Sequence, residues 1–333
     1  MIGTSLPSTS LPKAITLTKA LTSPSSPSIS RDEFHQLRQA FEGELGTVTR
    51  SLPVNERIRI DGYRLRNTVS ENADLDSPFR WLPWTARRPI GVECVRACLA
   101  CARLTPLQAS HDVIRRFVRR ADDERGHPGS LAEWLAGLAV GGRTVVQAEA
   151  VVWATQLLTA LDWTKLSRPI VGGDRSVVPS SSSRVLLRGR IEVLTRVVPA
   201  RSPNKGEALG ARDVGPAALF AMMTGRPSPT ARTELGLAAL TVALDGREGE
   251  APIRVVGWWP QCGRALVVPV DLALFNQTCD AVLGAVRSAC PPQRRQPRAA
   301  KDSVGGSGRR DAVRKPTRRA ATRVAPDTER VAS

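Results

Sequence analysis

Residues 185–244 carry the pattern that most constrains the fold, because two short apolar segments are followed by a helical repeat. The segments 185–197 and 217–227 are rich in Val, Leu, Ala and Met and are bounded by loops that contain Gly, Pro or Ser. Apolar runs of this length and setting predict two strands. A helix is expected from about residue 231, because leucines recur there at helical spacing, at Leu237, Leu240 and Leu244.

The chain is strongly basic, with 48 Lys and Arg against 31 Asp and Glu in 333 residues, a net charge of +17. Residues 291–333 hold twelve Lys or Arg and four Asp or Glu, a net charge of +8, which leaves +9 on residues 1–290. A flexible basic tail favours phosphate backbones through counterion release, and the alternative is a solubilising tail without a fixed partner. The tail residues predicted to contact nucleic acid are Arg294, Arg295, Arg309, Arg310, Arg314, Lys315, Arg318 and Arg319.

Both ends of the chain are predicted to be disordered, and residues 31–290 are predicted to form one domain. Residues 1–30 are mostly Ser, Thr and Pro, so they bury too little apolar surface to offset their ordering entropy. We find neither the pattern of a secretory signal nor a run of roughly 18 apolar residues that would span a membrane. These observations predict a cytoplasmic protein, and the Ala-, Arg- and Val-rich composition suits a bacterium of high GC content.

The first part of the domain, residues 31–166, is predicted to be mainly helical. Ser30 and Glu33 have the spacing of a capping box, which places a helix start at residue 31. Residues 51–80 are expected to be irregular, and four more helices are expected over residues 91–104, 106–120, 130–138 and 143–163. The last of these carries an apolar stripe at spacings of three and four, made of Val146, Ala150, Trp153, Leu157 and Leu161.

The second part, residues 184–290, is predicted to hold a small mixed sheet after a Gly- and Ser-rich loop over residues 169–183. Beyond the two strands already described, residues 253–260 and 264–270 are expected to pair as a hairpin. A last helix is expected over residues 272–289. The pattern predicts an α+β fold, in which a helical N-terminal region packs on a sheet with the order β-β-α-β-β-α.

Four arginines lie on one side of the helix predicted over residues 106–120. Apolar side chains at Ile114, Phe117 and Val118 are expected to face inward. The outward side is then formed by Arg115, Arg116, Arg119 and Arg120. Adjacent guanidinium groups suit a phosphate backbone, and the alternative is a solvated face balanced by the acidic residues that follow.

Three motifs follow one another on the predicted strands and helix: Gly189-Arg-Ile-Glu192, Ala221-Met-Met-Thr-Gly225 and Leu235-Gly-Leu-Ala-Ala-Leu240. Their order resembles that of the RecB-like nuclease domains of the PD-(D/E)xK superfamily, and the resemblance covers residues 77–288. In that family a helical region comes first, and the motifs read Gly-x-x-Asp, Asp-x-Lys-Thr-Gly and Leu-Gln-Leu-x-x-Tyr. Upstream, Val95 stands where the family has a His.

The resemblance implies a nuclease scaffold that has lost most of its catalytic groups. In such nucleases two or three carboxylates hold Mg²⁺, which activates water, and a Lys assists. Here Glu192 is the carboxylate that remains, Ala221 offers no ligand, and the thioether of Met223 does not suit a hard ion. We therefore expect a catalytically degenerate protein without a cofactor, which binds nucleic acid or a protein partner.

An active Mg²⁺-dependent nuclease stays an alternative if its carboxylates have moved to new positions. Asp213 lies before the second strand and Glu234 lies in the first turn of the next helix, so both could join Glu192 as ligands. Arg226 and Arg232 would then supply cations near a phosphate. Otherwise Glu192 is expected to pair with an Arg on the surface, and Glu234 to complement the helix dipole. A third class is a structural or regulatory interaction protein.

Cys94, Cys98 and Cys101 have the spacing C-x3-C-x2-C, which radical-SAM enzymes use to hold an iron–sulfur cluster. Here the three cysteines lie within a run of helix formers, and small buried cysteines on a helix face are the commoner arrangement. The three histidines are scattered, and the sequence contains no P-loop, nucleophile elbow or dinucleotide-binding glycine motif. These features leave the nuclease-like block as the main indication of function.

Overall fold

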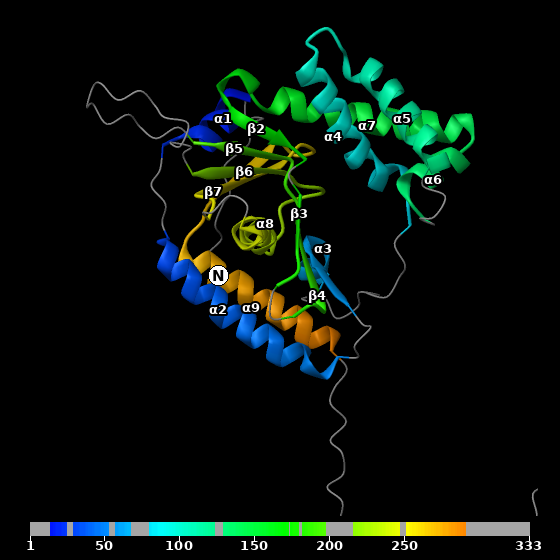
Figure 1. Ribbon diagram of the computed structural model, residues 1–333. Coiled ribbons are helices and arrows are strands. Elements are labelled where there is room, and N and C mark those ends of the chain that lie inside the picture. Colours follow the sequence, from blue (N-terminus) through cyan, green and yellow to red (C-terminus); the bar gives the residue numbers. More distant parts are fainter. Residues whose placement is uncertain are drawn as a thin grey trace, which may run out of the picture. The chain divides into compact units, whose positions relative to one another are not determined.

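Two mixed β-sheets form the centre of the fold, and helices pack on both faces of the larger sheet (Figure 1). The computed structural model describes residues 14–24, 29–52, 57–67, 80–123, 129–172, 174–179, 182–197, 216–246 and 251–290, which lie within one unit, Met1–Pro292. The fold is α+β, as the sequence pattern predicted. No helix in these residues is long and apolar enough to cross a membrane.

The larger sheet has five strands in the order β2, β5, β6, β7, β8. Their bounds are Ser167–Val171, Val193–Arg196, Ala217–Met222, Arg254–Trp259 and Arg264–Pro269. β6 and β7 are parallel and are joined by the crossover helix α8 (Ala231–Asp245), whereas the other neighbours are antiparallel. Every residue of β6 and β7 is buried, and β7 with β8 confirms the predicted hairpin.

The smaller sheet has three strands in the order β1 (Ile58–Asp61), β4 (Val185–Gly189) and β3 (Arg175–Val177). The prediction of one continuous strand over residues 185–197 was wrong, because β4 ends at Gly189 and the chain enters the larger sheet at Val193. Gly189 lies against α8 so closely that a β-carbon there would overlap the side chain of Thr241. The bend between the two sheets therefore follows the surface of α8.

Two segments that were expected to be irregular contain short elements. Within residues 51–80 the structure has β1 followed by α3 (Gly62–Asn67), and within residues 169–183 it has most of β2 and all of β3. In β1 burial alternates over only four residues, which is too short a pattern to separate from a loop. β2 and β3 are edge strands, where Pro, Ser and charged side chains are tolerated and the apolar signal is weak.

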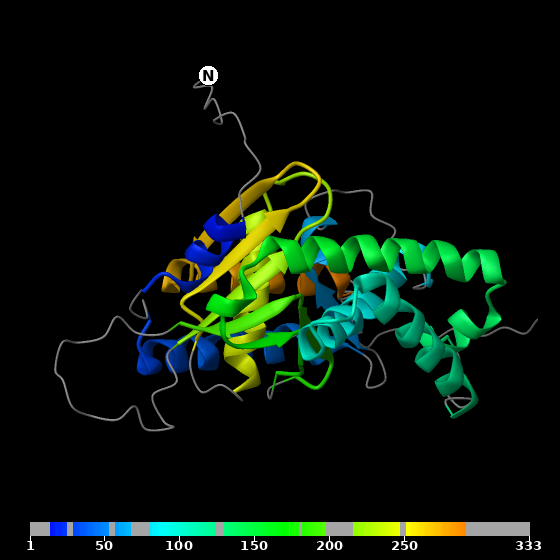
Figure 2. The ribbon, with the colours of Figure 1, turned by 90° about the horizontal axis from the view of Figure 1, so that it is seen from above.

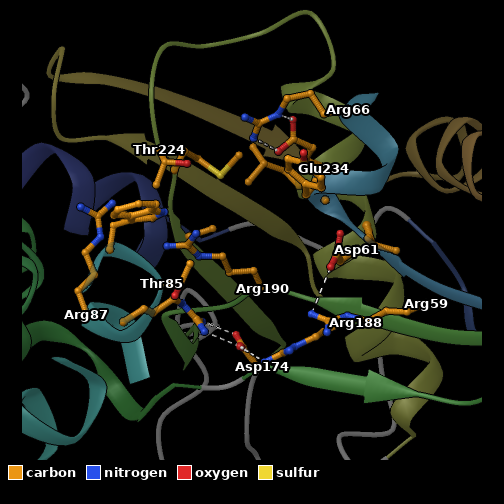
Figure 3. A pocket seen from close by; sticks show the side chains of 18 residues that line it. Arg59, Asp61, Arg66, Thr85, Arg87, Asp174, Arg188, Arg190, Thr224 and Glu234 are labelled. Atoms are coloured by element: carbon orange, nitrogen blue, oxygen red, sulfur yellow. Dashed lines mark hydrogen bonds and ion pairs between the residues drawn. The ribbon is translucent and has the colours of Figure 1, made fainter. Parts of the chain in front are cut away.

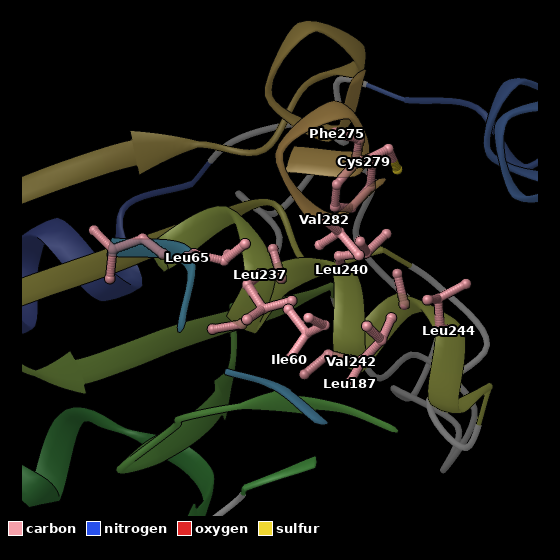
Figure 4. Packing of buried hydrophobic residues seen from close by; sticks show 14 of the residues in the cluster. Ile60, Leu65, Leu187, Leu237, Leu240, Val242, Leu244, Phe275, Cys279 and Val282 are labelled. Carbon is pink, nitrogen blue, oxygen red and sulfur yellow. The ribbon is translucent and has the colours of Figure 1, made fainter. Parts of the chain in front are cut away.

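One face of the larger sheet packs against α8, and α9 (Leu272–Ala289) and α2 (Arg31–Val48) lie beyond it. In Figure 4, Leu240 of α8 lies next to Val282 of α9, and all the labelled apolar side chains belong to one core. The last helix has the bounds that were predicted. The capping box of α2 is confirmed, because the Ser30 hydroxyl accepts the Glu33 N–H and the Glu33 carboxylate accepts the Ser30 N–H.

The opposite face of the larger sheet packs against α1 (Ala14–Thr22), and four further helices, here called the helical lobe, continue the same core beyond the β2 edge of the sheet (Figure 2). The helical lobe consists of α4 (Pro83–Ala100), α5 (Pro106–Asp123), α6 (Leu131–Gly137) and α7 (Val140–Ala160). Two short 3-10 helices, Thr49–Ser51 and Trp163–Lys165, complete the described elements. The stripe predicted for the long helix is buried throughout, from Val146 to Leu161.

Two predicted helices start earlier than expected, and one helix was not predicted. α7 begins at Val140 rather than at residue 143, so Gly141 and Gly142 lie inside the helix. α4 begins at Pro83 rather than at residue 91, with Pro89 inside the helix and the Leu82 N–H bonded to the Thr85 hydroxyl. α1 lies within residues 1–30, so the prediction of disorder was wrong for residues 14–22. Leu17 and Leu21 of α1 are buried against the sheet, and the Ser- and Pro-rich flanks hid this short apolar helix.

Candidate functional site

A cleft of about 560 Å³ opens where the smaller sheet, the start of α4 and the end of β6 meet (Figure 3). Its walls come from β1 and α3, from the first turns of α4, from β4 and the bend after it, and from β6 and α8. The lining is rich in arginine, with Arg59, Arg66, Arg87, Arg88, Arg188 and Arg190. The carboxylates that line the cleft are those of Asp61, Asp174 and Glu234.

β6 brings the two altered motif positions into this cleft. Successive side chains of a strand point to opposite faces, so Ala221 and Met223 share one side while Met222 packs into the core on the other. Both Ala221 and Met223 line the cleft, together with Thr224. The strand end therefore presents a methyl group, a thioether and a hydroxyl where the resemblance would require a carboxylate and an ammonium group.

Glu192 lies behind the cleft wall, fully buried in the bend between β4 and β5. Its carboxylate accepts hydrogen bonds from the backbone N–H of Met222 at 2.8 Å, from Arg88 Nε at 2.7 Å and from Arg190 Nε at 2.8 Å. Glu192 has arginine partners, as expected, but the expectation that it lies on the surface was wrong. A buried carboxylate is stable only when opposite charges and hydrogen-bond donors compensate it. Two guanidinium groups supply that compensation here.

Arg88 joins Glu192 to a second carboxylate, that of Asp174. Its Nη1 and Nη2 both donate to Asp174, while its Nε donates to Glu192. Burial alone would lower the pKa of Arg88, but the charge of Glu192 and the hydrogen bonds to Asp174 outweigh burial and raise it. Burial would likewise raise the pKa of Asp174, yet its bonds to Arg88 hold it below the ordinary value. The guanidinium is thus a fixed cation between two carboxylates.

Glu234 is held separately. Arg66 donates to its two oxygens at 3.0 and 2.8 Å, and the Thr230 hydroxyl donates at 3.1 Å. The hydrogen bond to Glu234 raises the pKa of Arg66. Figure 3 shows the Arg66–Glu234 pair at one end of the cleft and Asp174 at the other.

The carboxylates proposed for a relocated metal site are not assembled in the described part of the chain. Each of Glu192 and Glu234 is bonded to its own arginine partner, and Asp213 lies outside the described residues. Within the residues that are described, no three His, Cys, Asp or Glu side chains are grouped so as to hold a metal ion. The residues present at the strand ends therefore do not fit Mg²⁺.

The charges of the cleft are arranged in two layers. The side chains of Arg59, Arg66, Arg188 and Arg190 are 40–47% exposed. Their carboxylate partners are more covered, from 29% exposure at Asp61 down to zero at Glu192. Guanidinium groups face the opening while carboxylates hold them from below, which is a suitable arrangement for binding an anion.

Among these four arginines, Arg188 has the longest contact with a carboxylate. Its contact with Asp174 is 3.8 Å long, and its guanidinium group donates no hydrogen bond to any residue that the structure describes. Burial, followed by repulsion from the like charge of Arg59, lowers its pKa. An added anion would relieve that repulsion.

The arginines of α5 form a second basic surface, away from the lining of the cleft. Arg115, Arg116, Arg119 and Arg120 are all exposed, and Ile114, Phe117 and Val118 face inward as predicted. Arg116 and Arg120 border a small hollow of about 130 Å³ that also includes Glu93.

Arg226 is exposed in the loop after β6 and Arg232 lies in the first turn of α8, but neither lines the cleft. The basic residues predicted in the tail, 294–319, lie outside the described residues.

The three cysteines of α4 differ in their surroundings. Cys94 is buried, Cys98 is partly buried and Cys101 is exposed at the helix end. Burial, followed by the neighbouring Cys98, raises the pKa of the Cys94 thiol to about 12. Because metal ligands must be thiolates, Cys94 is poorly suited to hold a cluster.

Sequence reasoning missed several residues of the cleft. Arg88 and Asp174 were not identified, because one was placed before a helix and the other within a loop, and they are 86 residues apart. Arg59 and Tyr63 fell within a stretch that was expected to be irregular. Trp84 lay outside the predicted helices, although the arginine pair that follows it closely, Arg87-Arg88, was a signal that could have been followed.

Comparison with known proteins finds no family model that matches the chain and no curated protein that is significantly similar to it. The functional interpretation therefore depends on the sequence motifs, the fold and the contents of the cleft.

Proposed function

We propose that this protein is a nuclease-shaped module of the RecB-like type that binds nucleic acid without cleaving it. The observation that carries the proposal is the position of Arg88, whose guanidinium lies between Glu192 and Asp174. Beside it, Ala221 and Met223 offer no ligand for a hard cation. In this proposal, a protein cation takes the place that a metal-dependent nuclease gives to its metal ion.

Nucleic acid is the favoured ligand because positive charge is both abundant and well placed. The chain has a net charge of +17, the outer layer of the cleft is guanidinium, and α5 presents four exposed arginines. Arginine binds phosphate oxygens with paired hydrogen bonds, and such contacts supply most of the affinity of sequence-independent binding. The proposal includes action in the cytoplasm, as the sequence predicted.

The test compares binding and cleavage with the same linear DNA and the purified full chain. We expect retarded migration of the DNA in EDTA and no shortening of the DNA after incubation with Mg²⁺ or Mn²⁺. Cleavage that requires a divalent ion and disappears in Glu192→Ala would overturn the non-catalytic proposal and support an active nuclease. In that case Asp213→Ala and Glu234→Ala would identify the other ligands.

A role in protein interaction is the second candidate. The outer face of α7 favours it, because Val140, Val145 and Val152 are 79%, 52% and 56% exposed. This candidate predicts no measurable affinity of the full chain for DNA or RNA at low salt, which separates it from the first.

A further inference from the structure

Two aromatic side chains line the cleft and are left open to solvent. Tyr63, the one tyrosine of the chain, is 65% exposed, and Trp84 is 58% exposed. Three other tryptophans, Trp153, Trp258 and Trp259, are buried. Exposing large rings costs hydrophobic free energy, so their presence at one polar cleft indicates that a ligand covers them.

Both rings line the same cleft as the guanidinium groups. Tyr63 belongs to α3, next in sequence to β1, which carries Arg59, and Trp84 lies in the first turn of α4, close in sequence to Arg87, whose side chain is 25% exposed. The cleft therefore offers flat apolar surfaces together with cationic donors within one volume of about 560 Å³. That volume is within the range of pockets, roughly 300–1,000 Å³, that enclose small organic ligands.

We propose that the cleft binds a single unpaired nucleotide, with its phosphate on Arg59 and Arg188 and its base stacked on Trp84 or Tyr63. The inference rests on the proposed function and deepens it, because it names the ligand as single-stranded rather than duplex nucleic acid. A base that is paired within a duplex keeps its faces stacked on its neighbours, so it cannot lie on a protein ring. The guanidinium groups bind the phosphate directly, so the interaction needs no divalent ion.

The experiment measures fluorescence anisotropy of a labelled 12-mer of single-stranded DNA and of its blunt duplex, with the full chain in EDTA. We expect tighter binding of the single strand. At least one of the two variants Trp84→Ala and Tyr63→Ala is expected to weaken it by about 5- to 150-fold, which is the range given by base–aromatic stacking. Trp84→Phe keeps a ring and is expected to retain most of the affinity.

Arg188→Gln tests the phosphate contact, with Arg287→Gln as its matched control. Arg287 of α9 is 57% exposed and pairs with Glu44 of α2 at 3.2 Å. It does not line the cleft, so its replacement removes one charge without altering the cleft. We expect Arg188→Gln to weaken binding and to reduce the salt slope by about one, and Arg287→Gln to have little effect.

The outcomes separate this inference from the function on which it rests. Absence of binding to any nucleic acid overturns both. Binding that is equally tight for the duplex, or that is unchanged by Trp84→Ala, Tyr63→Ala and Arg188→Gln, overturns the nucleotide site and leaves the proposed function standing. Circular dichroism of each variant shows whether it is folded, and all three side chains are exposed enough for their replacement to leave the core intact.

Discussion

At the scale of single residues, Arg88–Glu192 is the most deeply buried of the described ion pairs at the cleft. Glu192 is fully buried and the Arg88 side chain is 17% exposed, so removing Arg88 leaves the buried carboxylate with Arg190 as its one charged partner and takes two hydrogen bonds from Asp174. We expect Arg88→Met to lower the free energy of unfolding by about 3–5 kcal/mol. Urea denaturation followed by circular dichroism measures this loss.

The control for that prediction is a pair of the same chemistry at the surface. Arg287→Met breaks the Arg287–Glu44 pair, whose side chains are 57% and 60% exposed, and is expected to cost less than about 1 kcal/mol. The double variant Arg88→Met with Glu192→Gln should recover part of the loss, because the buried charge is then gone. Equal costs at Arg88 and Arg287 would contradict the assignment of a buried ion pair.

Asp174 gives the same network a defined pH dependence. Its folded-state pKa lies below the ordinary value of 3.8, because its bonds to Arg88 outweigh the effect of burial. Its contribution to stability is therefore fully present above about pH 4 and is lost as the pH falls through the lower folded-state pKa. The difference in unfolding free energy between wild type and Asp174→Asn should shrink between pH 5 and pH 2, and a constant difference would refute this account.

At the scale of elements, α8 depends on a close contact with α9. A β-carbon at Gly236 would overlap the Thr278 hydroxyl and approach Leu274, so Gly236→Ala is expected to destabilise the fold by about 1–3 kcal/mol. Gly43 of α2 has open space around it, so Gly43→Ala is expected to stabilise by about 0.5–1 kcal/mol through helix propensity. Thermal unfolding of both variants tests the opposite signs, and a stabilising Gly236→Ala would show that α9 can move away.

The elements that could be predicted are those whose signal is local. α9 and α5 have regular apolar faces, and the β7–β8 hairpin has a turn between two apolar runs. The break between β4 and β5 could not be predicted, because Ile191 and Glu192 continue the strand-like sequence while tertiary contacts with α8 decide where the chain bends.

The candidate site shows the same limit. Ala221 and Met223 line a shared cleft, as alternation within one strand requires, whereas Glu192 does not line it. Arg88 was not expected, because its partner Glu192 is 104 residues away and nothing in the local sequence marks the pair. A buried carboxylate requires a cation, but the sequence alone does not indicate which of many arginines supplies it.

At the scale of the whole molecule, the dependence of binding on salt should divide between the folded body and the tail. Each phosphate that is neutralised contributes about 0.9 to the slope of log affinity against log salt concentration. Residues 291–333 carry a net charge of +8, so the full chain is expected to show a steeper slope than a version ending at Pro292, the end of the compact unit. Anisotropy titrations between 50 and 300 mM KCl measure both slopes.

The shortened chain is the decisive one, because its slope reports the folded body without the tail. We expect this slope to remain negative. Its magnitude should decrease by about one in Arg188→Gln, and should decrease further when Arg115, Arg116, Arg119 and Arg120 are changed to Gln. A slope near zero in the shortened chain would place all binding in the tail, and the guanidinium layer of the cleft would then serve only to neutralise its own carboxylates.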